Sequence, residues 1–61
     1  MEYISMIRTS GIEVNTGNVT PIMKNAVVTL IHENEKNVVV KQKWLEIEIP
    51  IKGFREGFVK V

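Results

Sequence analysis

The sequence predicts a mainly β fold, a small antiparallel five-stranded barrel or rolled sheet. The first observation behind this prediction is an alternating stretch in which Leu45, Ile47, Ile49 and Ile51 are separated by single residues, two of them glutamates. Successive side chains of a strand point to opposite faces, so these four aliphatic residues share one face. The second is a strong turn cluster at residues 15–18, which separates short segments of strand character.

Length and composition set limits on both fold and chemistry. The 61 residues form a single domain, 1–61, and the hydrophobic fraction of 44% is that of a folded chain. Cysteine is absent and there is one histidine, which excludes disulfides and a conventional zinc site, so no cofactor or metal is expected. The formal charge of +1 gives no overall attraction to nucleic acid, so such binding would need a local patch.

The chain also carries no targeting signal that we can read. Its N-terminal residues lack the basic start and long apolar core of a signal peptide. No run approaches the ~20 apolar residues that span a membrane, so we expect a cytoplasmic protein without membrane contact. A core this small often needs a supplement, and oligomerisation is the common one that remains, so a homo-oligomer is expected.

The N-terminal third contains two predicted strands. Residues 2–9 form the first, Ser10–Gly11 is a turn signal, and residues 12–16 form the second. The cluster at 15–18, Asn-Thr-Gly-Asn, is the strongest turn signal of the chain because asparagine and glycine both tolerate positive φ.

Residues 20–35 fit two structures. Apolar residues recur there at helical spacing, Thr20 could cap a helix, and Pro21 suits a first helical position. The alternative architecture is therefore ββαββ, an α+β fold with a helix at about 21–35. We favour a strand at 26–32, since Val27 and Val28 are β-branched.

That strand would form a hairpin with the residues after the loop at 33–37. In the expected register, Thr29 pairs with Lys41, Leu30 with Val40, and Ile31 with Val39.

The predicted fourth strand, 38–51, changes phase along its length. Val38 and Val40 are even-numbered, whereas the apolar positions from Leu45 onward are odd-numbered. If both halves contribute to one core, a bulge or sharp bend near 41–44 must reverse the alternation.

The C-terminus reads as a hairpin that ends in a strand at 58–61. Its loop would be Arg55-Glu56-Gly57, with Gly57 at the position that requires a left-handed residue. Phe54 would then lie opposite Phe58, and Val59 and Val61 would lie on the core face with the aliphatic residues of the preceding strand.

Aromatic and basic residues gather on the face opposite the aliphatic one, and they are the candidate binding residues. Our first hypothesis is a small non-enzymatic interaction or regulatory protein that binds itself or another protein. The aromatic rings would serve as apolar anchors, and edge strands would pair for assembly. The candidate residues are Trp44, Lys52, Phe54, Arg55, Phe58, Lys60, Lys41 and Lys43.

The alternative hypothesis is a single-stranded RNA- or DNA-binding protein. Exposed rings interleaved with cations can stack on bases and hold phosphates.

An enzyme is not expected. His32 precedes an acidic loop with Glu33 and Glu35, but this loop offers no evident pocket, and no glycine-rich phosphate loop is present.

Overall fold

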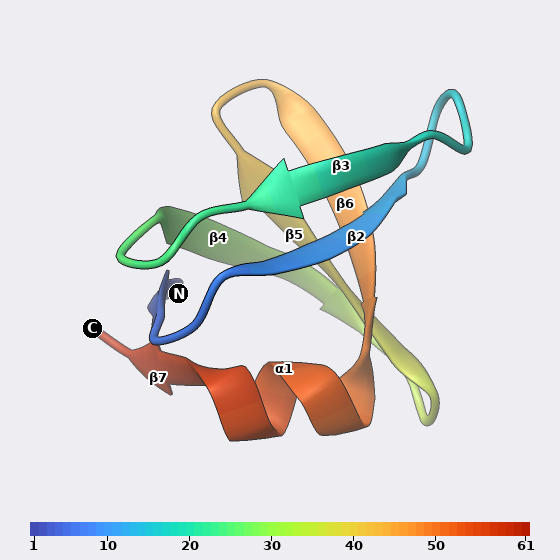
Figure 1. Cartoon of the computed structure of the whole chain (residues 1–61). Coiled ribbons are helices and arrows are strands. Elements are labelled where there is room, and N and C mark those ends of the chain that lie inside the picture. The colour runs from blue at the N-terminus through green and yellow to red at the C-terminus, as the bar shows by residue number, and fades with distance from the viewer.

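Seven strands form one antiparallel sheet in the computed structural model, which describes residues 1–61 (Figure 1). The spatial order is β3-β2-β6-β5-β4-β1-β7. The prediction of a mainly β rolled sheet is confirmed, with more strands than expected, and the alternative helix at about 21–35 is wrong. The elements are β1 (Glu2–Ser5), β2 (Thr9–Glu13), β3 (Val19–Ile22), β4 (Val27–Glu33), β5 (Asn37–Gln42), β6 (Leu45–Pro50), α1 (Ile51–Gly57) and β7 (Phe58–Lys60).

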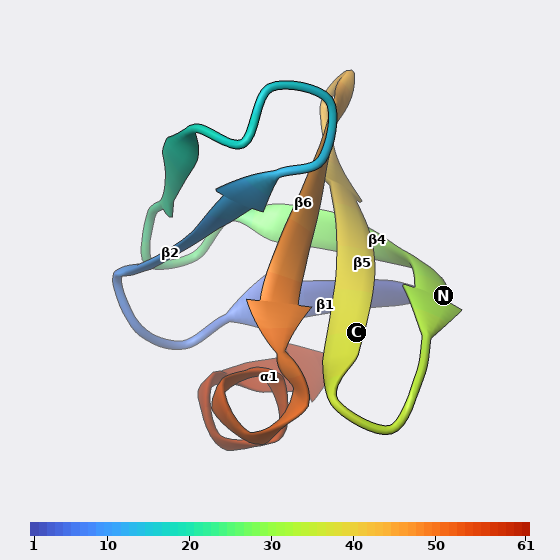
Figure 2. The same ribbon diagram turned by 90° about the vertical axis from the view of Figure 1, so that its right-hand side faces the viewer.

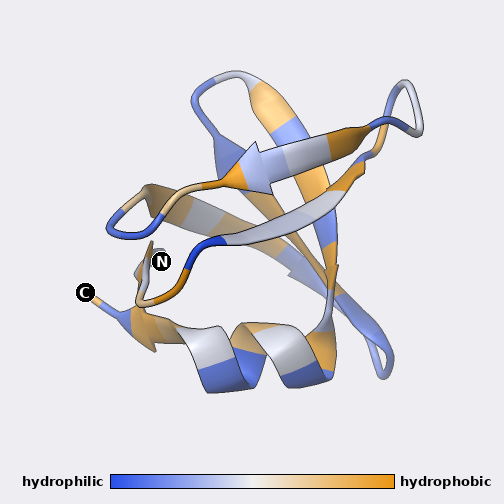
Figure 3. Ribbon diagram, in the orientation of Figure 1, coloured by the Kyte–Doolittle hydropathy of each residue, from blue (hydrophilic) through white to orange (hydrophobic).

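The sheet rolls over on itself and encloses the core. The β2–β3 hairpin crosses in front of β5 and β6 in Figure 1, and the rotated view separates the two layers (Figure 2). Helix α1 lies across one end of the roll, and its hydrophilic side faces away from the strands (Figure 3). The buried core consists of Ile22, Val28, Val38, Val40, Ile47, Ile49, Phe54 and Phe58.

The predicted strand 38–51 is in fact a hairpin. Strands β5 and β6 are joined by the two residues Lys43 and Trp44, and Val40 pairs with Ile47 across the ladder. Each pair of this register joins an even-numbered residue to an odd-numbered one, which explains the phase change. The expected bend is therefore a full chain reversal. The sequence concealed it because Lys43, rather than glycine or asparagine, adopts the positive φ of 58°.

The predicted hairpin between residues 26–32 and the segment that begins at residue 38 is confirmed as the β4–β5 pair, with one shift. Thr29 pairs with Lys41 and Leu30 with Val40, as expected, but Val39 pairs with His32 and not with Ile31. A bulge between Leu30 and His32 causes the shift. Ile31 is the extra residue on β4, so every pair after it is displaced by one residue.

The first strand ends sooner than predicted. It stops at Ser5, the chain turns over residues 6–8, and β2 already begins at Thr9, so the expected turn at Ser10–Gly11 is wrong. Gly11 lies within β2, at a position that has no room for a side chain. A Cβ atom there would overlap the Cγ2 atom of Ile47 and lie 2.7 Å from the carbonyl oxygen of Glu48.

The turn at residues 15–18 is confirmed, and a buried carboxylate holds it. Glu13 accepts hydrogen bonds from the backbone N–H of Asn15 and the hydroxyl of Thr16, both at 2.8 Å. Gly17 adopts a φ of 76° and donates its N–H to the Glu13 carbonyl at 2.8 Å. Glycine is favoured at this position because positive φ carries no Cβ penalty there.

The predicted C-terminal hairpin is wrong. Residues 51–57 form helix α1 after Pro50, and β7 then pairs with β1 instead of the preceding segment. A helical signal was present, since Ile51 and Phe54 are three residues apart and the residues between them are polar or small. Helix α1, with seven residues, falls far short of what a membrane-spanning helix requires.

Candidate functional site

The predicted aromatic and basic face does not exist as one surface. Phe54 and Phe58 are only 6% and 5% exposed and belong to the core. The ring of Phe54 lies 4.8 Å from that of Tyr3 in an edge contact and 5.1 Å from that of Phe58 in a stacked one. The expectation that these phenylalanines bind a partner or bases is therefore corrected: they hold α1 and β7 on the sheet.

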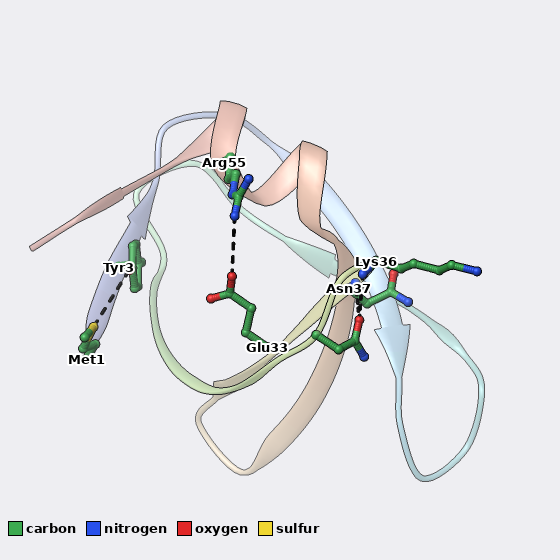
Figure 4. A network of polar contacts seen from close by, with 7 residues as sticks. Met1, Tyr3, Glu33, Lys36, Asn37 and Arg55 are labelled. Carbon is green, nitrogen blue, oxygen red and sulfur yellow. Dashed lines mark hydrogen bonds and ion pairs between the residues drawn. The ribbon is translucent and has the colours of Figure 1, made fainter.

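Three of the predicted cations lie on elements other than the β5–β6 hairpin that carries Trp44. Lys52 and Arg55 are exposed on α1, and Lys60 pairs with Tyr3 between β7 and β1. Arg55 forms an exposed ion pair with Glu33, 3.6 Å apart (Figure 4). Such pairs contribute little to stability because water screens them.

An open cavity of about 530 Å³ lies beside this ion pair. It combines two carboxylates with one guanidinium and a single apolar residue, so it has no strong preference for an anion or an apolar ligand. His32 is not among the residues that line it. The lining residues are Glu33, Asn34, Glu35, Ile51 and Arg55.

The remaining predicted residues, Lys41, Lys43 and Trp44, stay together at the β5–β6 hairpin. Trp44 is 79% exposed, more than any other large hydrophobic residue of the chain. An indole held in water at a hairpin tip does not contribute to the core. Its exposure is therefore the main pointer to a binding surface.

Lys43, the residue before Trp44, is one of the residues that line a groove of about 310 Å³. Its walls come from the end of β3, the turn that follows, the start of β4 and the end of β5. Met23 and Val27 leave 54% and 50% of their surface exposed there. Trp44 follows the lining residue Lys43 in the chain, and we call this groove, together with Trp44, the Trp44 groove. The residues that line the groove are Pro21, Met23, Ala26, Val27, Gln42 and Lys43.

One hydrogen bond and two turn conformations shape the Trp44 groove. The Gln42 side-chain amide donates a 3.5 Å hydrogen bond to the Pro21 carbonyl, which links the end of β5 to β3. The two non-glycine residues with positive φ, Asn25 at 74° and Lys43 at 58°, lie in the two turns that border the groove. Asparagine tolerates this conformation, whereas for lysine it costs about 1–2 kcal/mol. Backbone strain of this kind concentrates at functional sites.

The charged residue that lines the Trp44 groove is basic. Lys43 lines it, Lys24 lies in the β3–β4 turn between Met23 and Asn25, and no carboxylate is among the lining residues. Lys41 lies farther along β5, directly opposite Glu46 in the register, so its charge is partly balanced.

Both edges of the sheet carry features that hinder strand pairing. In β3, Val19 and Pro21 direct their backbone groups away from β2, because hydrogen-bonded positions alternate and Glu13 bonds to Asn18. Pro21 has no N–H, and Gln42 occupies its carbonyl. At the other edge, β7 has three residues and ends in Lys60. Short strands, proline and lysine are how β proteins protect their edges, so these features disfavour the predicted edge-strand assembly.

Sequence reasoning missed most of the groove-forming residues. Met23 and Val27 flank the Lys24–Asn25 turn, and the tolerance of asparagine for positive φ was the available signal for that turn. Residues 20–35 also fitted a helix, and a helix would have placed these side chains differently.

Comparison with known proteins gives no relative for this chain: no family model, no curated protein and no solved structure matches it. The geometry of the Trp44 groove is therefore what bears on function.

Proposed function

We propose that this chain is a small non-enzymatic interaction protein that binds a partner polypeptide in the Trp44 groove. The observation that carries the proposal is the position of Trp44, which is 79% exposed at a hairpin tip and directly follows Lys43, a residue that lines a partly apolar groove. The proposed absence of enzyme activity and the expected cytoplasmic location stay predictions.

The residue types of the Trp44 groove suit a protein partner. Tryptophan is among the residues that most often dominate binding energy when a partner buries them. Met23 adds a flexible, polarizable side chain that can adapt to the partner's shape, and Val27 adds a rigid apolar wall. Gln42 and Lys43 supply polar groups at the margin, as is usual around an apolar contact.

The alternative, binding of single-stranded nucleic acid, has less support. Of the three aromatic residues expected to stack on bases, only Trp44 is exposed, since Phe54 and Phe58 are buried. Stacking proteins place several rings along the strand, and one ring gives a single stacking contact. We therefore rank a polypeptide partner first.

A selection from a displayed library of random peptides tests the proposal. Peptides enriched on the wild-type protein are then measured against Trp44→Ser and Val27→Ser. We expect both substitutions to weaken binding at least tenfold, since loss of one good apolar anchor costs about 2 kcal/mol or more.

Val59→Ser is the matched control. Val59 is 49% exposed, almost the same as Val27, but it lies on β7, two strands away from β4 in the sheet. Its substitution should leave peptide affinity unchanged. Failure to enrich any peptide whose binding depends on Trp44 would contradict the proposed function.

A further inference from the structure

We infer that the segment bound in the Trp44 groove is acidic as well as apolar: a polypeptide that places carboxylates beside an apolar anchor. This inference rests on the proposed function and adds the chemistry of the partner. The formal net charge of +1 does not show how the lysines and glutamates are distributed over the molecule.

No carboxylate is among the residues that line the Trp44 groove. Lys43 lines the groove, and Lys24 stands in the opposite turn, next to Met23. Glu46, on the same hairpin as Trp44, lies opposite Lys41 in the register. Glu33 and Glu35 line the other cavity, and Glu13 is bound within the β2–β3 turn. An incoming segment therefore meets apolar walls and the positive charge of Lys43, with Lys24 one residue along the chain from the lining residue Met23.

A second copy of this chain is a poorer occupant. In a two-fold contact the same patch is present on both sides, so Lys24 and Lys43 would approach their own copies. Like charges placed opposite one another oppose association, and no carboxylate of the groove lining would compensate.

Nucleic acid is also a poorer occupant, although it is anionic. The Trp44 groove presents one aromatic ring, and its walls are aliphatic: Pro21, Met23, Ala26 and Val27. Aliphatic walls match aliphatic or aromatic side chains of a peptide better than they match the polar edges of bases. Lysine attracts a nucleic acid as well as an acidic peptide, because both are negatively charged. An oligonucleotide must therefore be tested beside the peptides.

The charge inference is tested with the peptides from the same selection. Enriched sequences should contain more aspartate and glutamate around their apolar residues than the starting library does. Their affinity should fall as salt rises, because exposed charge pairs are screened. Removal of each lysine charge should weaken binding by up to about fivefold.

Charge reversal gives the sharper variant. The double substitution Lys24→Glu with Lys43→Glu should abolish binding of the acidic peptides and redirect a new selection toward basic ones. Lys36→Glu with Lys52→Glu is the matched control. It changes the net charge equally, but Lys36 lies in the β4–β5 turn and Lys52 on α1. This control should bind as the wild type does.

The outcomes separate the two proposals. Enriched peptides that depend on Trp44 but are neutral or basic would overturn the acidic partner and leave the proposed function in place. No Trp44-dependent peptide at all would overturn the proposed function. A mixed-sequence single-stranded oligonucleotide that binds more tightly than any peptide, and loses affinity in Trp44→Ser, would overturn both in favour of nucleic acid.

Discussion

Phe58, the first residue of β7, stacks its ring on that of Phe54 in α1, with ring centroids 5.1 Å apart and an angle of 23° between the planes. Both rings are buried, and the edge contact of Tyr3 with Phe54 extends the cluster to β1. This cluster is what fastens the C-terminal segment to the sheet. It also removes two aromatic residues from the surface and leaves Trp44 as the exposed ring at the candidate site.

The first prediction concerns this cluster. Phe58→Ala should lower the free energy of unfolding by about 3–5 kcal/mol, since a buried ring is replaced by a cavity. A domain of this size rarely has more than about 3–5 kcal/mol of stability, so we expect the variant to be largely unfolded. Urea denaturation followed by circular dichroism measures the effect.

Phe58→Leu supplies a milder comparison. It keeps most of the buried volume and should cost about 1 kcal/mol. A Phe58→Ala variant with the wild-type denaturation midpoint would show that the ring is not buried in solution.

The second prediction compares two glycines. Gly11→Ala should destabilise the fold by about 2 kcal/mol, because the new methyl group overlaps Ile47 and the backbone of β6. Gly53→Ala should instead stabilise by about 0.5–1 kcal/mol, since its Cβ meets no atom within 4 Å and alanine favours the helix. Thermal denaturation of both variants checks the opposite signs, and equal shifts in the same direction would refute the close approach of β2 to β6.

The third prediction concerns the positive φ of Lys43. Lys43→Gly should raise the free energy of unfolding by about 0.5 kcal/mol, because relief of the backbone strain exceeds the added freedom of the unfolded chain. Lys41→Gly, two residues earlier in β5, should lower it by about 1 kcal/mol. The ranking of the two denaturation midpoints is the measurement. A midpoint for Lys43→Gly below that for Lys41→Gly would contradict the strained turn.

The fourth prediction concerns Glu13. Its carboxylate accepts two hydrogen bonds at the β2–β3 turn and is nearly buried. Glu13→Ala leaves those donors without a partner and should cost about 1–3 kcal/mol. Glu35→Ala, at an exposed loop residue, should change stability by less than about 0.5 kcal/mol. If chemical denaturation found the two variants equally stable, the carboxylate would not hold the turn.

The sequence predicted most of the pattern of strands, because that pattern depends on local alternation. Ile47 and Ile49 are buried as their spacing indicates, and Leu30 pairs with Val40. Val59 and Val61 were also expected in the core, yet they are exposed. Their burial depended on the C-terminal hairpin, and a short helix there removed the pairing on which the prediction rested.

The errors share a physical cause, which is that tertiary contacts override weak local signals. Gly11 looked like a turn residue but serves a close approach between strands. Lys43 carried no turn signal, yet the pairing of Val40 with Ile47 holds it in a tight reversal. At the candidate site, Trp44 and its neighbouring lysines were predicted, whereas Met23 and Val27 were not, since they reach the groove only after the chain has rolled over.

The emission of Trp44 tests the central claim most directly, because it is the only tryptophan of the chain. The free protein should emit as a water-exposed indole does. Titration with a peptide from the displayed library should shift the emission to shorter wavelength and saturate at the affinity that calorimetry gives for the same peptide. Peptide binding that calorimetry detects while the emission of Trp44 stays unchanged would contradict the claim that the Trp44 groove is the binding surface.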